Sequence, residues 1–430
     1  MSTRPARHKT FVIVISLIVL SASMVVDTLS AAPSDFRVSL SVSPFTETIL
    51  KTGTQFTDGA VTAKTMEELQ RLFVAHGANE VYARISTRRS AVNGAGNHSM
   101  NGAIERARIA KALGLPFNPE LGLFASYGDI RCQPAPDFSD YGITLPGPWA
   151  TLTLEQMTPV LKAYGAAAAR EILATGVSVR IWDVGNEVEL GLAGVAVRPM
   201  PGGCDASAGA TDPYAAPDRV NRELGQMSGD QLVRMDEAAR INWLRTSLWP
   251  AEAALLKAVA DGIRSVDAQA RFSTHVSGVA STQPRVAAAF FTAMRDGGFL
   301  VDEAGASYYP TSSRFPTDRV QAFKDTVAAV HAAIDRPTFI AEFGFPNRTM
   351  TPPFAWNDPP QGYALTPEGQ AAFLRDLVAW SRQSGFVTGI RPWAPELVVP
   401  GWAPMALFAR HGSPLVTANQ ALDVFVSMMK

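Results

Sequence analysis

The sequence lacks a charge imbalance. Across its 430 residues, 38 Lys and Arg oppose 39 Asp and Glu, which gives a formal net charge of −1 at pH 7. Beyond the first ten residues there is also no run of Lys and Arg. A chain without a basic patch has no general attraction for a phosphate backbone, so we expect no nucleic-acid partner.

Cysteine is scarce, because only Cys132 and Cys204 occur. Two thiols are too few to form a metal site by themselves, and no segment has the ligand spacing of a calcium loop. We therefore expect no metal and no cofactor. In an exported protein two cysteines are usually oxidised when they can reach each other, so they form either a disulfide between neighbouring loops or two unrelated buried residues.

Long apolar runs are absent except near the N-terminus, where Phe11 to Val26 follows Arg4, Arg7 and Lys9. Basic residues, an apolar run and then small residues are typical of a signal peptide. A single-span anchor is the alternative, because the run falls only slightly short of the roughly 20 residues of a membrane span. We expect residues 1–32 to be a signal peptide or anchor, and the protein to be secreted or periplasmic. Membrane attachment through residues 11–26 requires that this segment is not cleaved.

The remaining chain, residues 33–430, contains no Ser/Gly linker and no low-complexity stretch, which favours one domain. Strand-like and helical segments alternate along it. Eight strands are expected, at 36–42, 80–85, 120–125, 177–184, 271–276, 305–308, 338–342 and 387–393. Helices are expected at 62–77, 100–114, 153–176, 232–266, 283–298, 319–334 and 366–385.

This alternation implies parallel strands joined by right-handed crossovers, and eight units imply an α/β fold of the (β/α)8 TIM-barrel type. An open doubly wound sheet is the alternative, but no G-x-G-x-x-G follows the first strand. A barrel needs about 250 residues, so the surplus lies in loops. The largest excess is 191–230, which is either a loop over the barrel mouth or an insertion without a role.

Two carboxylates end expected strands, Glu187 in "IWDVGNEVELG" and Glu342 in "PTFIAEFGFPN". The C-terminal strand ends of such a barrel converge on one mouth. Two facing carboxylates suit cleavage of a glycosidic bond, in which one donates a proton and the other attacks the sugar. At a separation of about 5 to 5.5 Å, like charges push the two pKa values apart and the configuration is retained.

The stretch "DVGNEVELG" resembles the acid/base motif of the retaining barrel hydrolases of clan A. Within that clan the chain is similar to glycoside hydrolase family 53, the endo-β-1,4-galactanases. Similarity extends from about residue 78 to the C-terminus and is carried by "GASYYP", "TPEGQAAFLRDL" and "IRPWAPELVVPGWAPMALFARHGSPL".

The resemblance implies that Glu187 is the general acid/base, that Glu342 is the nucleophile and that Asn186 donates to the sugar 2-hydroxyl. Tyr308 or Tyr309 would hold the second oxygen of the nucleophile, since strand alternation turns only one of them inward.

Three further residues receive roles from the same resemblance. His275 would bind the acid/base or a sugar hydroxyl, or else be an ordinary polar neighbour. Trp393 would lie under the sugar ring, or else pack in the core. Arg84 would support the nucleophile by charge, or else form a structural ion pair. We expect Glu189 to contact solvent or substrate, and Asp183 to brace the barrel.

Some positions depart from the family. "FASYGDIRC" retains Tyr127 and Asp129 but lacks an expected His, an aromatic residue is expected after "SYYP" where this chain has "TSSRFP", and Asn347 stands where another aromatic residue is expected. Since aromatic rings contribute much of the affinity for sugars, the substrate stays open. The first hypothesis is a secreted retaining β-glycosidase resembling arabinogalactan endo-β-1,4-galactanase, acting as a monomer on a polysaccharide or oligosaccharide. The alternatives are a hydrolase or transglycosylase for another β-linked glycan, and a non-catalytic carbohydrate-binding barrel.

Overall fold

The computed structural model describes residues 36–91, 96–199, 217–312, 318–352, 354–410, 412 and 414–427. The predicted signal peptide or anchor at 1–32 lies outside these residues and stays a prediction. Among the helices of the described part, none is long and apolar enough to cross a membrane.

Eight parallel strands form the central sheet, in the order β1-β12-β11-β10-β9-β6-β5-β4. Their bounds are β1 Arg37–Val38, β4 Val81–Ile85, β5 Phe117–Leu121, β6 Trp182–Val184, β9 Phe272–Val276, β10 Glu303–Tyr308, β11 Thr338–Phe343 and β12 Val387–Pro392. The two edges of this order also meet, because the Asn79 N–H donates to the Val38 carbonyl at 3.1 Å. All eight expected strands are present in the expected order, and the (β/α)8 prediction is confirmed.

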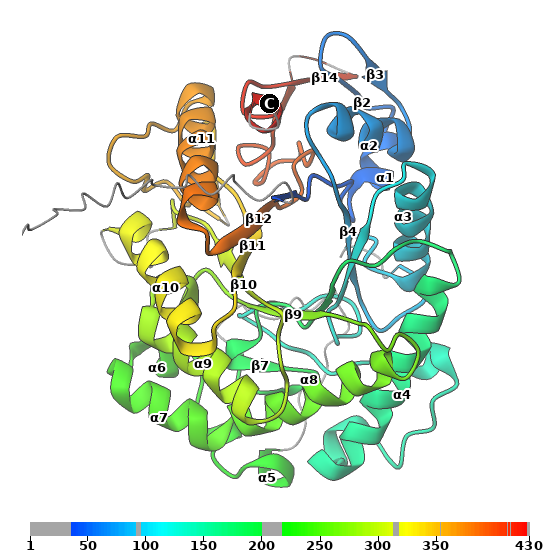
Figure 1. Ribbon diagram of the computed structural model, residues 1–430, viewed down its shortest axis with the longest axis vertical. Helices are drawn as coiled ribbons and strands as arrows, with labels where there is room; N and C mark the ends of the chain where they lie inside the picture. Colours follow the sequence, from blue (N-terminus) through cyan, green and yellow to red (C-terminus); the bar gives the residue numbers. More distant parts are fainter. Residues whose placement is uncertain are drawn as a thin grey trace, which may run out of the picture.

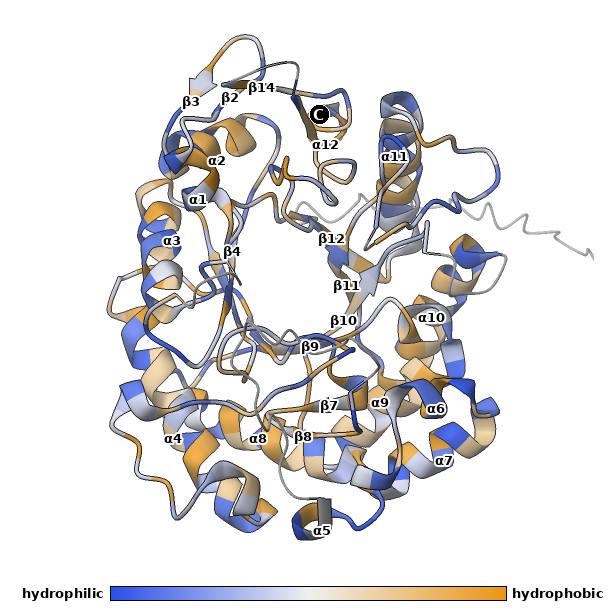
Figure 2. Ribbon diagram, turned by 180° about the vertical axis from the view of Figure 1, so that it is seen from behind, coloured by the Kyte–Doolittle hydropathy of each residue, from blue (hydrophilic) through white to orange (hydrophobic). Residues whose placement is uncertain are grey.

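Helices surround the sheet (Figure 1). The main ones are α2 Met66–Ala75, α3 Met100–Ala112, α4 Leu154–Leu173, α8 Trp249–Arg264, α9 Pro284–Asp296, α10 Arg319–Ile334 and α11 Pro367–Ser384. Two of them begin at a capping box: Thr65 and Thr153 each exchange hydrogen bonds with the residue three positions on. Figure 2 shows apolar residues along these helices, interspersed with hydrophilic stretches.

The helix expected at 232–266 is divided into α6 Gly229–Arg234, α7 Glu237–Ser247 and α8. Met235 is extended, and Asp236 caps α7 by accepting from the Ala239 N–H at 3.0 Å. Pro250 then lies in the first turn of α8, where a missing N–H costs nothing. The prediction of one helix was wrong because these stop and start signals lie within an otherwise helical pattern.

A second sheet was not expected. It comprises β2 Gln55–Thr57, β3 Thr62–Ala63, β13 Phe408–Arg410 and β14 Leu415–Ala418, in the order β13-β14-β2-β3. It lies beside α2 (Figure 1), and the rings of Phe56 and Phe408 pack at 5.1 Å. This sheet therefore joins an early part of the described chain, β2 and β3, to a late part, β13 and β14.

The long loop between the fourth and fifth barrel strands begins as a buried hairpin, β7 Gly191–Leu192 and β8 Val195–Ala196. The Trp149 indole N–H donates to the Ala193 carbonyl at 2.7 Å and holds this hairpin. Residues 200–216 lie outside the described part, so the predicted position of the loop over the mouth stays a prediction.

Candidate active site

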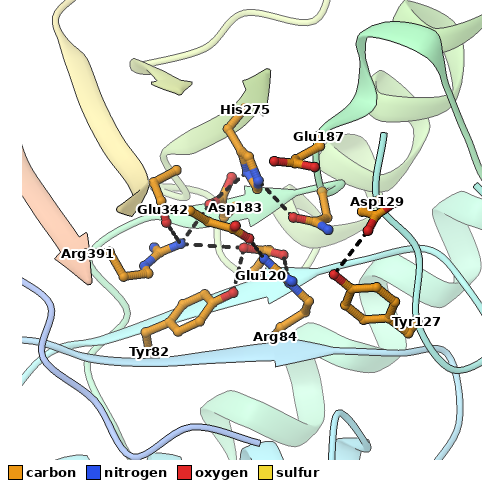
Figure 3. Close-up of polar contacts among 12 residues, drawn as sticks. Tyr82, Arg84, Glu120, Tyr127, Asp129, Asp183, Glu187, His275, Glu342 and Arg391 are labelled. Atoms are coloured by element: carbon orange, nitrogen blue, oxygen red, sulfur yellow. Dashed lines mark hydrogen bonds and ion pairs between the residues drawn. The ribbon is translucent and has the colours of Figure 1, made fainter. Parts of the chain in front are cut away.

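Glu187 and Glu342 both lie at the C-terminal side of the barrel. Glu342 is the fifth residue of β11, and Glu187 follows β6 after a sharp turn. In this turn Gly185 has a φ of 86° and Glu187 a φ of 52°, so the chain leaves the strand direction at once. Figure 3 shows both carboxylates within one group of polar side chains.

The Glu342 carboxylate is bound by a cation and a hydroxyl. Arg84, on β4, donates through Nη2 to Oε1, and the Tyr309 hydroxyl donates to Oε2 at 2.6 Å. Both donors are buried with it. Charge-assisted bonds of this kind orient and stabilise a carboxylate anion, which is the form that attacks an anomeric carbon.

Of the two tyrosine alternatives, Tyr309 makes this contact and Tyr308 does not. The Tyr308 ring stacks on Phe323 of α10 at 4.0 Å, in the layer between the sheet and the helices. Consecutive residues of an extended chain point to opposite faces, so only one could reach Glu342. Of the two alternatives, the contact with Glu342 therefore belongs to Tyr309, and its assignment to Tyr308 is corrected.

Glu187 has different surroundings, although it too is only 8% exposed. Its Oε2 accepts the Ile130 N–H at 3.3 Å. Burial raises its pKa to about 8, with further contributions from the negative charges of Glu342, Asp129 and Glu189. A carboxyl group with this pKa holds its proton at neutral pH and can donate it.

Asn186 and His275 form a pair beside Glu187. The Asn186 Nδ2 donates to the Gly128 carbonyl at 2.6 Å, and its Oδ1 lies 2.8 Å from His275 Nε2. Burial lowers the pKa of His275, but the adjacent Asp183 carboxylate outweighs it and the net pKa rises to about 9. A protonated His275 donates to Asn186 and fixes the amide, which is fully buried.

Trp393 follows β12 and is half-buried. One side of its ring stacks on Phe45 at 5.8 Å and 23°, and Arg84 lies 5.5 Å from its centroid. It therefore borders the same space as Glu342, as a sugar platform requires.

A charged network beneath the two carboxylates was not predicted. Glu120 on β5 accepts from Arg84 Nε and from the Tyr82 hydroxyl, the latter at 2.7 Å, and Arg391 Nη1 of β12 lies 3.4 Å from it. Arg391 also lies 3.5 Å from Asp183, which braces the barrel as expected. A sequence signal existed: Tyr82 and Arg84 are two residues apart on one strand, as inward-facing neighbours are.

Glu120, Asp183 and His275 bring their ligand atoms within 4.8 Å of one another, which is close enough to hold a metal ion. Both Glu120 oxygens, however, already accept hydrogen bonds from Arg84 and Tyr82. The donors present suit a network of ion pairs, with positive charge supplied by the protein itself.

The prediction for Glu189 was wrong. This side chain is 2% exposed, and it accepts from the Ser277 hydroxyl and from the Ser277 N–H, the latter at 2.9 Å. It joins the turn after β6 to the turn after β9.

The two cysteines were expected either to form a disulfide or to be unrelated buried residues. Cys132 is buried, whereas Cys204 lies outside the described residues, so their pairing stays a prediction.

Two aromatic rings lie near Tyr309, one in the loop after β11 and one in the loop after β12. Trp356 lies 5.0 Å from Tyr309, and Trp402 lies 6.1 Å from it. Asn347, in place of an aromatic residue, donates its backbone N–H to the Pro404 carbonyl at 2.7 Å and so connects the loops after β11 and β12. Trp356 shares its loop with Asn347, so an aromatic ring near Tyr309 comes from this loop at another sequence position.

Comparisons with known proteins agree with this geometry. The family model for glycosyl hydrolase family 53 matches residues 220–422, a range that contains His275 and Glu342 but begins after Glu187. No curated protein sequence matches the chain significantly.

Solved structures show the same fold. The family 53 catalytic domain of Ignisphaera aggregans superposes with a TM-score of 0.65 at 18% identity, covering 91% of this chain and 96% of that one. A fungal β-1,4-galactanase gives 0.63 at 18% identity, covering 90% and 98%. A family 10 xylanase from Bispora sp. MEY-1 gives 0.50 at 13% identity, covering 88% and 98%. The chain is a glycoside hydrolase of the (β/α)8-barrel fold, related to family 53.

Proposed function

We propose that the protein is a secreted retaining β-glycosidase that hydrolyses a polysaccharide by double displacement. The observation that supports this is the contrast between its two carboxylates. Glu342 accepts from a guanidinium and a phenol, whereas Glu187 lies among negative charges and has a pKa near 8. The first environment suits a nucleophile and the second suits a proton donor.

In the first step, Glu187 gives its proton to the glycosidic oxygen while a Glu342 oxygen attacks the anomeric carbon. The bond to the leaving group breaks as the ester bond to Glu342 forms. In the second step, ionised Glu187 takes a proton from water, whose oxygen displaces Glu342 from the sugar. Asn186 would donate to the 2-hydroxyl in both transition states.

The substrate we propose first is β-1,4-galactan, because the family match and the fungal galactanase fold both favour it. A second candidate is another β-linked glycan, which the departures from the family in the strand-three loop and at Asn347 favour. Since both carboxylates are present, no observation favours a non-catalytic barrel. Export rests on the N-terminal sequence pattern, and action as a monomer is likewise a proposal.

The test is release of reducing ends by the exported protein from a panel of β-1,4-galactan, β-1,4-mannan, β-1,4-xylan and β-glucan. The matched control is the Glu342→Gln variant, which keeps the size of the side chain. Release from galactan by the wild type alone supports the first substrate, and release from another glycan supports the second. No release from any glycan, or an inverted product seen by NMR at early times, would overturn the proposed function.

A further inference from the structure

The loop between β5 and α4 contacts the Asn186–Glu187 turn at several points. The Gly128 carbonyl accepts from Asn186 Nδ2 at 2.6 Å, and the Ile130 N–H donates to Glu187 Oε2 at 3.3 Å. Gln133 Nε2 donates to the Asn186 carbonyl at 2.7 Å. We call residues 127–133 the clamp segment, because it holds this turn through both side chains and backbone.

The clamp segment has a fixed conformation of its own. Asp129 and Cys132 exchange two backbone hydrogen bonds of 2.9 Å. The Asp129 side chain also accepts the Arg131 N–H at 2.8 Å and Arg131 Nη2 at 2.7 Å, and the Tyr127 hydroxyl lies 3.4 Å from it. Asp129 is buried, whereas the Arg131 side chain is 42% exposed. A buried negative charge is thus balanced by a cation that reaches solvent.

Charged groups face Glu187 from four directions. They are Glu342 on β11, Glu189 in the turn after β6, protonated His275 on β9 and Asp129 in the clamp segment. Glu342 loses its charge when it forms the ester. Asp129 takes no part in bond making, so its charge persists through both steps. Figure 3 shows Asp129 beside Glu187, and the Tyr127 hydroxyl points toward Asp129.

We propose that Asp129 is a positioning residue that, in addition to burial and the charge of Glu342, helps to keep Glu187 protonated in the free enzyme, and that Arg131 sets how strong the contribution of Asp129 is. The inference rests on the proposed role of Glu187. A fixed negative charge opposes the ionisation of a neighbouring carboxyl group, and a cation on that charge weakens the effect. Removal of Asp129 and removal of Arg131 therefore act in opposite directions.

The experiment measures kcat/KM against pH for three variants. Asp129→Asn keeps an oxygen acceptor for Arg131. It is expected to move the basic limb of the profile, where kcat/KM declines at high pH, to lower pH by about one unit. Arg131→Gln is expected to move it to higher pH by a smaller amount. Asp137→Asn is the matched control: it lies on the same loop, pairs with Arg88 at 2.7 Å, and should leave the limb unchanged.

A loss of activity in Asp129→Asn without any shift of the limb would overturn the inference, because it indicates a purely structural role. Shifts of the same sign in Asp129→Asn and Arg131→Gln would also overturn it. If Asp129→Asn does not fold, Arg131→Gln alone still tests the inference, because its basic limb must move to higher pH.

A second measurement needs no substrate. NMR titration of protein labelled with δ-13C glutamate, with Glu187→Gln assigning the resonance, reports the pKa of Glu187 in the same variants. The expected shifts in the NMR titration would support the inference even if no glycan in the panel is cleaved. An unchanged pKa in both variants would overturn it even if the enzyme is a galactanase.

Discussion

The two sides of the active site place the same kind of side chain in opposite surroundings. On the β11 side, Glu342 lies against the Arg84 guanidinium and the Tyr309 hydroxyl. On the β6 side, Glu187 lies near Asp129, and its carboxylate accepts a hydrogen bond from the Ile130 backbone N–H. The identity of the residue therefore does not assign its role. The charges supplied by neighbouring strands and loops do so.

The largest expected effect is the loss of the nucleophile. Glu342→Gln should lower kcat by about 10⁴-fold or more, because no covalent intermediate can form. Azide added to Ala variants distinguishes the roles of the two carboxylates. Glu342→Ala should give an α-glycosyl azide, and Glu187→Ala should give a β-glycosyl azide. NMR of the products checks this. The same anomer from both variants would contradict the assignment of roles.

Arg84 should matter for stability as well as for activity. Arg84→Met leaves Glu120 and Glu342 without their shared cation in a buried site, and such a loss costs about 3–5 kcal/mol of unfolding free energy. Chemical denaturation measures it. Arg234→Met, which removes an exposed ion pair on α6, is the control and should change stability far less. Equal effects would mean that the network beneath the site is not a buried unit.

The two adjacent tyrosines provide a matched pair. Tyr309→Phe removes a hydrogen bond to a charged group, worth about 1.5–3 kcal/mol, so kcat should fall about 10- to 100-fold. Tyr308→Phe should leave kcat close to that of the wild type, because this ring packs against Phe323. Steady-state kinetics compare the two directly, and a larger loss in Tyr308→Phe would contradict the geometry.

The pH dependence follows from Glu187. Its pKa is raised to about 8, so the proton donor is present below that pH and is lost as pH rises through it. We expect kcat/KM to fall about tenfold per pH unit above the limb. A profile that stays flat to pH 9.5 would show that Glu187 is not the acid.

The sequence predicted the barrel because its signals are local and repeated. Apolar runs alternating with capped helices identified every barrel strand, and strand ends identified Glu187 and Glu342. The second sheet had no such signal, since β14 and β2 are short and pair Val416 with Phe56 across most of the chain.

Within the site, alternation could limit the tyrosine contact to one of two residues but could not choose between them. The register of β10 shifts between Ala306 and Ser307, just before both tyrosines, so counting along the strand fails there. Glu120 and Arg391 were missed for another reason. Charged residues in buried strands are rare unless paired, and the pairing is visible only when β5 and β12 meet inside the barrel.

The backbone at Glu187 has a consequence for how this enzyme can change. A φ of 52° places a side chain with a Cβ in the left-handed region, which costs roughly 1–2 kcal/mol relative to a glycine there. The site is also buried, so an ionisable group adds its own penalty. Glu187→Gly should therefore unfold at a higher temperature than the wild type in a thermal melt, and an unchanged or lower melting temperature would refute this. Selection for stability alone would then discard Glu187, and the proposed acid/base role accounts for a glutamate at this turn.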